Sequence, residues 1–251
     1  MLRIYYAETY EEMSRRAASF MAAQVLANPA SVIGLATGSS PVGMYTELAR
    51  LCSDGVITFR GVHTVNLDEY YGLAPEHDQS YRYFMEKNFF SKIDIQPENT
   101  NLPDGKNPSP EAECARYDAL IDSLGGIDMQ LLGIGHNGHI GFNEPSDHFT
   151  PGTNCITLTD DTIDANKRFF ATRDEVPKRA LTMGIRAIMQ AKKILLVANG
   201  ENKAEILERA LFGPVTPEVP ASILQLHGDV VVCGDAAALS VIRARHPEAL
   251  L

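Results

Sequence analysis

Tryptophan is absent from this chain of 251 residues, and cysteine is scarce. The four cysteines (Cys52, Cys114, Cys155 and Cys233) lie far apart without a C-x-x-C pair, which argues against a disulfide or zinc framework and predicts free thiols in a reducing cytoplasm. No apolar run approaches the ~18 residues of a membrane span. The opening residues, MLRIYYAETYEE, lack the apolar segment of a secretory signal. We therefore expect a cytoplasmic protein without a membrane segment.

Positive charge is also in short supply. Lys and Arg number 22 against 32 Asp and Glu, so the net charge is −10 with histidine neutral. Such an acidic chain is a poor general binder of nucleic acid or of anionic membranes. The composition, 45% hydrophobic and 22% charged, excludes disorder. The length suits one α/β domain, which we expect to span residues 1–251.

What the sequence does contain is an alternation of short apolar runs with helical patterns. Predicted strands cover residues 2–6, 31–36, 63–67, 127–134, 156–158, 193–198 and 230–233. Predicted helices cover residues 10–28, 41–51, 80–90, 160–170, 181–190, 202–212 and 236–245, with one more starting at Ser109, and residues 68–79 are expected to form a polar loop. Six or seven strands in this alternation predict an open, mostly parallel sheet with helices on both faces, as in Rossmann-like folds.

In such sheets, ligands bind beyond the carboxyl ends of the strands. Four predicted loops meet that condition, and they start at Thr37, Asp68, Gly135 and Asn199. The catalytic and binding residues are therefore expected in these loops.

The loop GIGHNGHIGFNEP, residues 133–145, allows three interpretations. Its G-x-G-x-x-G resembles a dinucleotide fingerprint, but that motif must open a helix at once, and no helical pattern follows here. His136, His139, Glu144 and His148 could supply metal ligands, although the i, i+3 spacing of the first two suits a helix better than a glycine-rich loop. The third interpretation is metal-free acid–base chemistry, because a carboxylate such as Glu144 can orient the imidazole of His139.

The other loops are less specific by themselves. Asp68 and Glu69 follow a buried strand, where desolvation raises a carboxyl pKa and suits a general base, although a helix cap or loop acid fits equally well. The turn Thr37–Pro41 offers hydroxyls and amide groups at a helix start, which is either an anion site or an ordinary turn. Taken singly, Lys203 and Arg168 are typical of solvated surface charges.

Taken together, these segments resemble the glucosamine-6-phosphate deaminase family. The matching pieces run in order and include LATGSSPVGMY, VNLDEYYGL, SYRYFMEKNFF, LLGIGHNGHIGFNEP, LTDDTIDANKRFF, VPKRALTMGI and ANGENKA. The resemblance implies conversion of glucosamine 6-phosphate and water into fructose 6-phosphate and ammonia, in amino-sugar breakdown. It also implies that neither a cofactor nor a catalytic metal takes part.

The resemblance assigns roles to individual residues. Asp68 would move the proton from C2 towards C1, His139 would open the sugar ring, Glu144 would orient that imidazole, and Asn137 would act through hydrogen bonds alone. The substrate phosphate would be held by Thr37, Gly38, Ser39, Ser40, Arg168 and Lys203.

Two rival functions and one departure from the family follow. A 6-phosphogluconolactonase would share the fold, and so would a non-catalytic sugar-phosphate sensor, although the sequence has no basic DNA-binding segment.

Regulated deaminases use basic residues shortly after FNEP, where this chain has Asn154 and Ile156, and the chain has no long tail after the last predicted helix. We therefore expect no activation by N-acetylglucosamine 6-phosphate. The sequence leaves homo-oligomerisation open.

Overall fold

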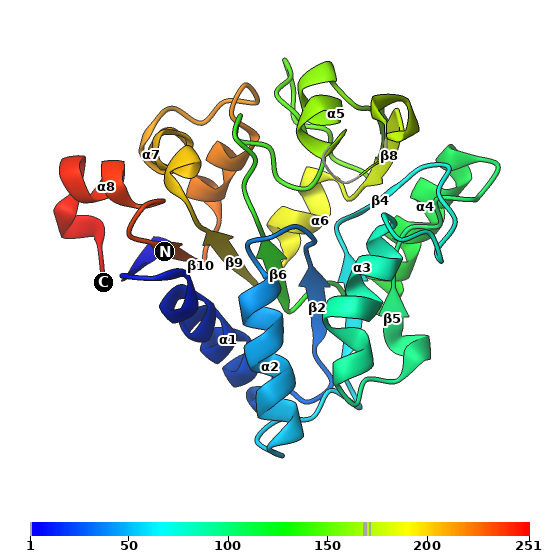
Figure 1. Ribbon diagram of the computed structural model, residues 1–251, viewed down its shortest axis with the longest axis horizontal. Coiled ribbons are helices and arrows are strands. Elements are labelled where there is room, and N and C mark those ends of the chain that lie inside the picture. Colours follow the sequence, from blue (N-terminus) through cyan, green and yellow to red (C-terminus); the bar gives the residue numbers. More distant parts are fainter. Residues whose placement is uncertain (1, 168–169, 171) are drawn as a thin grey trace.

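The computed structural model describes residues 2–167, 170 and 172–251 (Figure 1). Its strands are β1 (Leu2–Ala7), β2 (Val32–Leu35), β3 (His63–Asn66), β4 (Asp68–Tyr70), β5 (Thr100–Asn101), β6 (Met129–Leu132), β7 (Asn154–Thr157), β8 (Arg179–Thr182), β9 (Lys193–Ala198) and β10 (Val230–Asp235). Its α-helices are α1 (Tyr10–Ala27), α2 (Val42–Ser53), α3 (Tyr81–Asn88), α4 (Pro110–Ser123), α5 (Asp160–Asn166), α6 (Ile185–Gln190), α7 (Ala204–Phe212) and α8 (Ser240–Arg245).

Seven of the strands form one parallel sheet in the order β1-β10-β9-β6-β2-β3-β5. Every residue of β2, β6 and β10 is buried. Because successive side chains of a strand point to opposite faces, burial of all of them means that both faces of the sheet are covered. The predicted open parallel sheet is confirmed.

The sheet order explains where a site can form. The four loops selected from the sequence follow β2, β3, β6 and β9, and these strands are consecutive neighbours in the order β9-β6-β2-β3. Since the strands are parallel, their carboxyl ends lie along one edge. In Figure 1 the arrowheads of β2 and β6 point towards the part of the molecule that contains α5 and β8.

A second sheet of three strands, in the order β4-β8-β7, was not predicted. Residues 68–70 were expected in a loop, but they form β4 and pair antiparallel with β8, so that Asp68 stands opposite Thr182. The expected helix over residues 181–190 is likewise wrong in its first part, because residues 179–182 form β8, and α6 begins only at Ile185. Both strands depend on partners distant in the sequence, which a local pattern does not reveal.

Local sequence signals set several helix starts as expected. The side chains of Thr9, Ser80 and Ser109 cap α1, α3 and α4 by accepting a backbone N–H in the first turn. Pro41 was expected as the first residue of α2, but it is the N-cap, and the helix begins at Val42. In the expected helix over residues 160–170, α5 ends at Asn166, and Arg168 lies outside the described residues. None of the described helices is long and apolar enough to span a membrane.

Candidate active site

The loop after β6 is folded tightly around its glycines. Gly138 and Gly141 have φ values of +89° and +59°, which residues other than glycine rarely adopt. A Cβ on Gly135 would lie 2.2 Å from Cε1 of His139, so the imidazole occupies the space that a side chain would fill. Gly135 therefore leaves the space in which the imidazole of His139 lies.

Glu144 is the centre of a hydrogen-bonded group. Its Oε2 accepts a hydrogen bond from Nδ2 of Asn137 at 2.7 Å, and its Oε1 accepts one from the Thr162 hydroxyl at 2.6 Å. Nδ1 of His139 lies 3.4 Å from the same Oε1, long for a hydrogen bond, and no other described group meets that buried nitrogen. Burial raises the pKa of Glu144, but the His139 side chain, the Thr162 hydroxyl and the Asn137 amide together lower that pKa to about 2. The carboxylate is therefore ionised and directed at the imidazole.

Asp68 lies at the other side of this loop. Its side chain is only 6% exposed, and desolvation, followed by the negative charge of Glu69, raises the pKa of Asp68 to about 8. A Cβ on Gly141 would stand 3.5 Å from Oδ2 of Asp68, so the carboxyl lies beside the loop that holds His139 and Glu144. A carboxyl that can hold or release a proton near neutral pH suits general-base chemistry.

The two helix-start turns are joined to each other. The Ser40 hydroxyl donates a 2.7 Å hydrogen bond to Oδ1 of Asn199, which connects the loop after β2 with the loop after β9. Lys203 ends the short 3-10 helix Glu201–Lys203 in that second loop. Gly38, at φ +99°, turns the first loop, and nothing within 4 Å would meet a Cβ there. The turn of residues 37–40 and the turn of residues 199–203 are thus joined by a hydrogen bond at the carboxyl edge of the sheet.

Sequence reasoning missed several side chains that form hydrogen bonds with the candidate site or its loops. Thr162 contacts Glu144, and the Thr182 hydroxyl accepts a hydrogen bond from the amide of Phe142 at 3.0 Å. Asp235, at the end of β10, accepts hydrogen bonds from the amides of Gly200 and Ala238. Only Asp235 had a usable signal, because it ends a strand at the same edge of the sheet.

The metal interpretation lacks a matching geometry. Within the described residues, no group of three or more His, Cys, Asp or Glu side chains is placed to hold a metal ion. The ring centroids of His136 and His139 are 6.3 Å apart, and His148 is exposed and paired with Asp147. The donors proposed from the loop sequence therefore do not converge.

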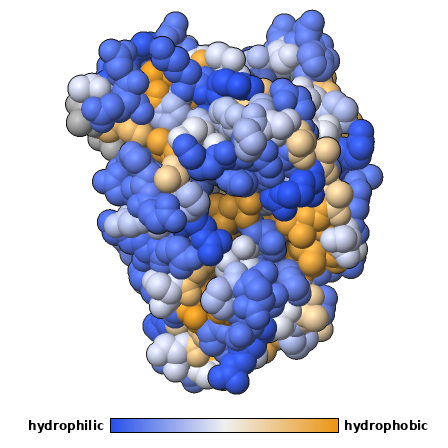
Figure 2. All heavy atoms as spheres, turned by 90° about the vertical axis from the view of Figure 1, so that its right-hand side faces the viewer, coloured by the Kyte–Doolittle hydropathy of each residue, from blue (hydrophilic) through white to orange (hydrophobic). Residues whose placement is uncertain are grey.

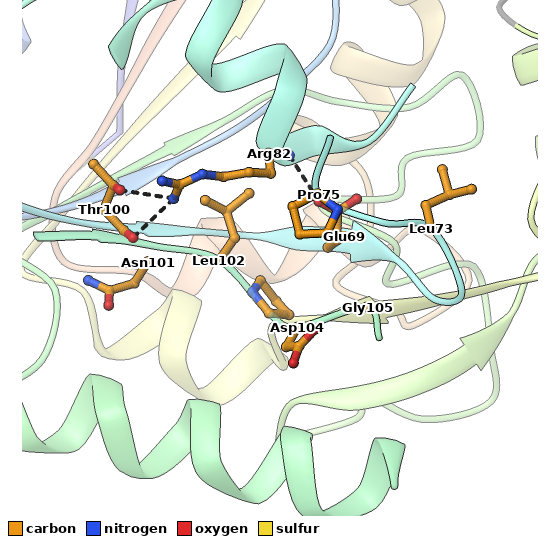
Figure 3. Close-up of a pocket in the computed structure, with 10 residues that line it drawn as sticks. Glu69, Leu73, Pro75, Arg82, Thr100, Asn101, Leu102, Asp104 and Gly105 are labelled. Atoms are coloured by element: carbon orange, nitrogen blue, oxygen red, sulfur yellow. Dashed lines mark hydrogen bonds between the residues drawn. The ribbon is translucent and has the colours of Figure 1, made fainter. Parts of the chain in front are cut away.

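A separate pocket of about 250 Å³ lies on the other side of β4. Glu69, next to Asp68 on the strand, lines it together with Leu73, Arg82 and Leu102 (Figure 3). The guanidinium of Arg82 donates to the carbonyl and hydroxyl oxygens of Thr100. Figure 2 shows this side of the molecule, with apolar residues in a recess between polar rims. The pocket contains none of the residues predicted to act on substrate.

Comparison with known proteins identifies the class. The chain belongs to the family of glucosamine-6-phosphate isomerases and 6-phosphogluconolactonases, whose model matches residues 6–232. Within that family, the chain is 57% identical to a curated glucosamine-6-phosphate deaminase of Lachnoclostridium phytofermentans over 92% of this chain and 98% of that one. It is 50% identical to the deaminase of Clostridioides difficile, covering 97% and 98% of the two chains.

Among solved structures, too, a deaminase is more similar to this chain than a lactonase is. A monomeric glucosamine-6-phosphate deaminase superimposes with a TM-score of 0.93 at 46% identity, covering 95% of this chain and 99% of that one. A 6-phosphogluconolactonase from Thermotoga maritima superimposes with a TM-score of 0.73 at 20% identity, over 94% and 99% of the chains. The second similarity shows a shared fold and no more.

Proposed function

We propose that this protein is a glucosamine-6-phosphate deaminase, an enzyme that converts glucosamine 6-phosphate and water into fructose 6-phosphate and ammonia. The observation that carries the proposal is the 57% identity to a curated deaminase over nearly the whole of both chains. The side-chain arrangement supports it, because a buried carboxyl and an imidazole–carboxylate pair lie on adjoining loops.

The chemistry divides between the two groups. His139, oriented by Glu144, transfers the proton that opens the sugar ring, while Asn137 fixes the carboxylate. Asp68, in its ionised form, takes the proton from C2 and returns it at C1, while one amine proton passes to O1, so that the C1 aldehyde becomes a hydroxyl group and the C2 amine becomes an imine. Water then adds to the imine carbon and ammonia leaves, which gives the C2 ketone of fructose 6-phosphate. The hydrogen moves within one molecule, so the step needs no redox cofactor.

The phosphate is bound away from the reacting carbons. The turn of residues 37–40 is hydrogen-bonded to Asn199, at the start of the loop that contains Lys203, and the proposal adds Lys203 and Arg168 to this turn. Amide groups, an ammonium and a guanidinium suit a dianion. Binding energy gained there is available to orient the sugar against Asp68.

The deciding experiment mixes the purified protein with glucosamine 6-phosphate and measures ammonia and fructose 6-phosphate. We expect both products in equal amounts without added metal or cofactor. A parallel assay with 6-phosphogluconolactone tests the lactonase, and binding without turnover would indicate a sensor. Absence of ammonia from a folded, substrate-binding protein would overturn the proposal.

We also propose one catalytic domain over residues 1–251, acting in the cytoplasm as a monomer. All four cysteines are free thiols, which supports a reducing compartment.

The described part exposes few large hydrophobic side chains, among them Leu26, Val56 and Leu226, whereas stable dimers bury apolar patches; this supports the monomer. Sedimentation equilibrium giving 27.5 kDa would agree, and twice that mass would contradict the monomer.

A further inference from the structure

Thr162 reaches the catalytic carboxylate from a different part of the chain. It lies on α5, is only 3% exposed, and donates its hydroxyl proton to Oε1 of Glu144 at 2.6 Å. That oxygen is the one that lies 3.4 Å from Nδ1 of His139. The orientation of the Glu144 carboxylate towards the imidazole therefore depends on a residue outside the catalytic loop.

The hydroxyl of Thr162 is itself fixed. Thr159, the N-cap of α5, accepts a hydrogen bond from the amide of Thr162 at 3.2 Å and donates one to its hydroxyl oxygen at 3.1 Å. A hydroxyl has one proton to donate, so accepting from Thr159 leaves that proton for Glu144. Chains of hydrogen bonds of this kind polarise one another.

The helix that bears Thr162 is also anchored to the second sheet. Its next residue, Ile163, packs in an apolar cluster with Tyr70 of β4 and Phe142 of the loop after β6. The position of α5 is therefore linked to Asp68 through β4 and to His139 through the loop. Beyond α5 the chain continues towards Arg168, which lies outside the described residues.

Resting on the proposed function, we infer that Thr162 is a positioning residue for ring opening: its hydroxyl holds the Glu144 carboxylate against His139 and makes that alignment depend on the placement of α5. Thr162 does not itself contact the reacting atoms.

The test compares Thr162→Val, which removes the hydroxyl while keeping the shape, with Thr162→Ser, which keeps the hydroxyl. We expect Thr162→Val to lower kcat about tenfold, the loss typical of a hydrogen bond to a charged group, with a smaller change in KM, and Thr162→Ser to stay near wild type. The stability that the ionised Glu144 contributes should be lost at a higher pH in Thr162→Val than in the wild type, because a donor that favours the ionised carboxylate is gone.

Two controls separate this role from simple support of the helix. Thr157→Val makes the same change at an exposed position on β7 and should leave activity unaltered. Thr159→Ala removes the cap of α5 and one hydrogen bond to the Thr162 hydroxyl, but it leaves the donation from Thr162 to Glu144 in place, so it should lower stability and reduce kcat less than Thr162→Val does. An equal fall in kcat for the two variants, with the pH dependence of stability unchanged in both, would contradict the inference.

A double-mutant cycle with Glu144→Gln completes the test. If Thr162 acts through Glu144, the pair should be no slower than Glu144→Gln alone, whereas independent effects would multiply and overturn the inference. The same cycle on the free energy of unfolding tests the contact without using activity. Should the wild type release no ammonia, the proposed function fails, and coupling in the unfolding cycle still decides whether Thr162 holds Glu144.

Discussion

Asp68 and Glu69 are consecutive buried acids, but only Glu69 is met by hydrogen-bond donors. Its two oxygens accept hydrogen bonds from the amides of Tyr70, Tyr81 and Arg82, at the start of α3. Among the described residues, no donor meets the Asp68 carboxyl, which lies on the opposite side of β4, towards the catalytic loop. Glu69 thus anchors the start of α3, whereas the carboxyl of Asp68 accepts no hydrogen bond among the described residues, as the proposed general base requires.

Replacing Asp68 by Asn should lower kcat by at least about tenfold, because an amide cannot accept the C2 proton. The side chain keeps its size, so the fold should persist. Steady-state ammonia release measures the effect, with circular dichroism as the check on folding. Turnover equal to wild type would show that another group is the base.

The same substitution should stabilise the protein. The folded state holds the Asp68 proton up to a pKa of about 8, whereas the unfolded chain releases it near 3.8, so wild-type stability falls as pH rises between these values. The neutral amide of the Asp68→Asn variant carries no such cost, so the gain in stability should grow from pH 6 to pH 8 and level off above it. Urea unfolding at pH 6, 8 and 9 measures it, and a gain that does not depend on pH would point to packing instead.

The pH dependence of kcat/KM should follow Asp68. Because the base must be ionised, kcat/KM should rise with an apparent pKa near 8. Glu69→Gln removes the neighbouring negative charge that contributes to the raised pKa, so the rise should move to lower pH. The variant also loses an acceptor for the α3 amides and should be less stable. A profile unchanged by Glu69→Gln would contradict the electrostatic coupling.

Glu144 should act on stability in the opposite direction. Its pKa falls from 4.5 to about 2 on folding, so its contribution is present above pH 4.5 and is lost as pH falls towards 2. Glu144→Gln should be less stable than wild type at pH 7, with the gap closing near pH 3. Its kcat should fall at least about tenfold, through loss of the imidazole's partner. Urea unfolding at the two pH values measures the gap, and a gap of equal size at both would contradict the lowered pKa.

Asp235 should control substrate affinity through the turn after β9. It accepts the amide hydrogen bond of Gly200, whose φ of +89° fixes the path to Lys203, and it is 9% exposed. Asp235→Ala should raise KM about tenfold with a smaller change in kcat, since the amides of Gly200 and Ala238 lose their acceptor. Asp235→Asn, which keeps one acceptor oxygen, is the matched control. Inhibition by inorganic phosphate should weaken in parallel with the rise in KM.

Rate curves should be hyperbolic, with no activation by N-acetylglucosamine 6-phosphate. The positions where basic effector ligands were expected hold Asn154 and Ile156 on β7. Asn154 donates to the carbonyl of Gly152, and Ile156 packs against the apolar cluster of the second sheet. Initial rates with and without the effector test this, and sigmoidal curves made hyperbolic by it would refute the prediction.

The main sheet and the loops at its edge were predictable because both depend on local patterns. Short apolar runs mark buried strands, and the strand-end rule then selected the loops that contain Asp68, His139 and Lys203. The second sheet was predicted only in β7, which overlaps the strand expected over residues 156–158, whereas β4 and β8 were missed because they are defined by pairing with partners distant in the sequence. The hydrogen bond from Thr162 to Glu144 depends on the packing of α5 against that sheet. No local sequence pattern therefore indicated it.

That second sheet also governs the order of events as the chain folds. Asp68 can pair with Thr182 only after the intervening chain has been made and brought back, a loop closure that costs entropy before any contact is gained. Until then both acids of β4 stay hydrated and their proton affinities remain ordinary. Catalytic competence should therefore appear during refolding only after β4 and β8 have paired.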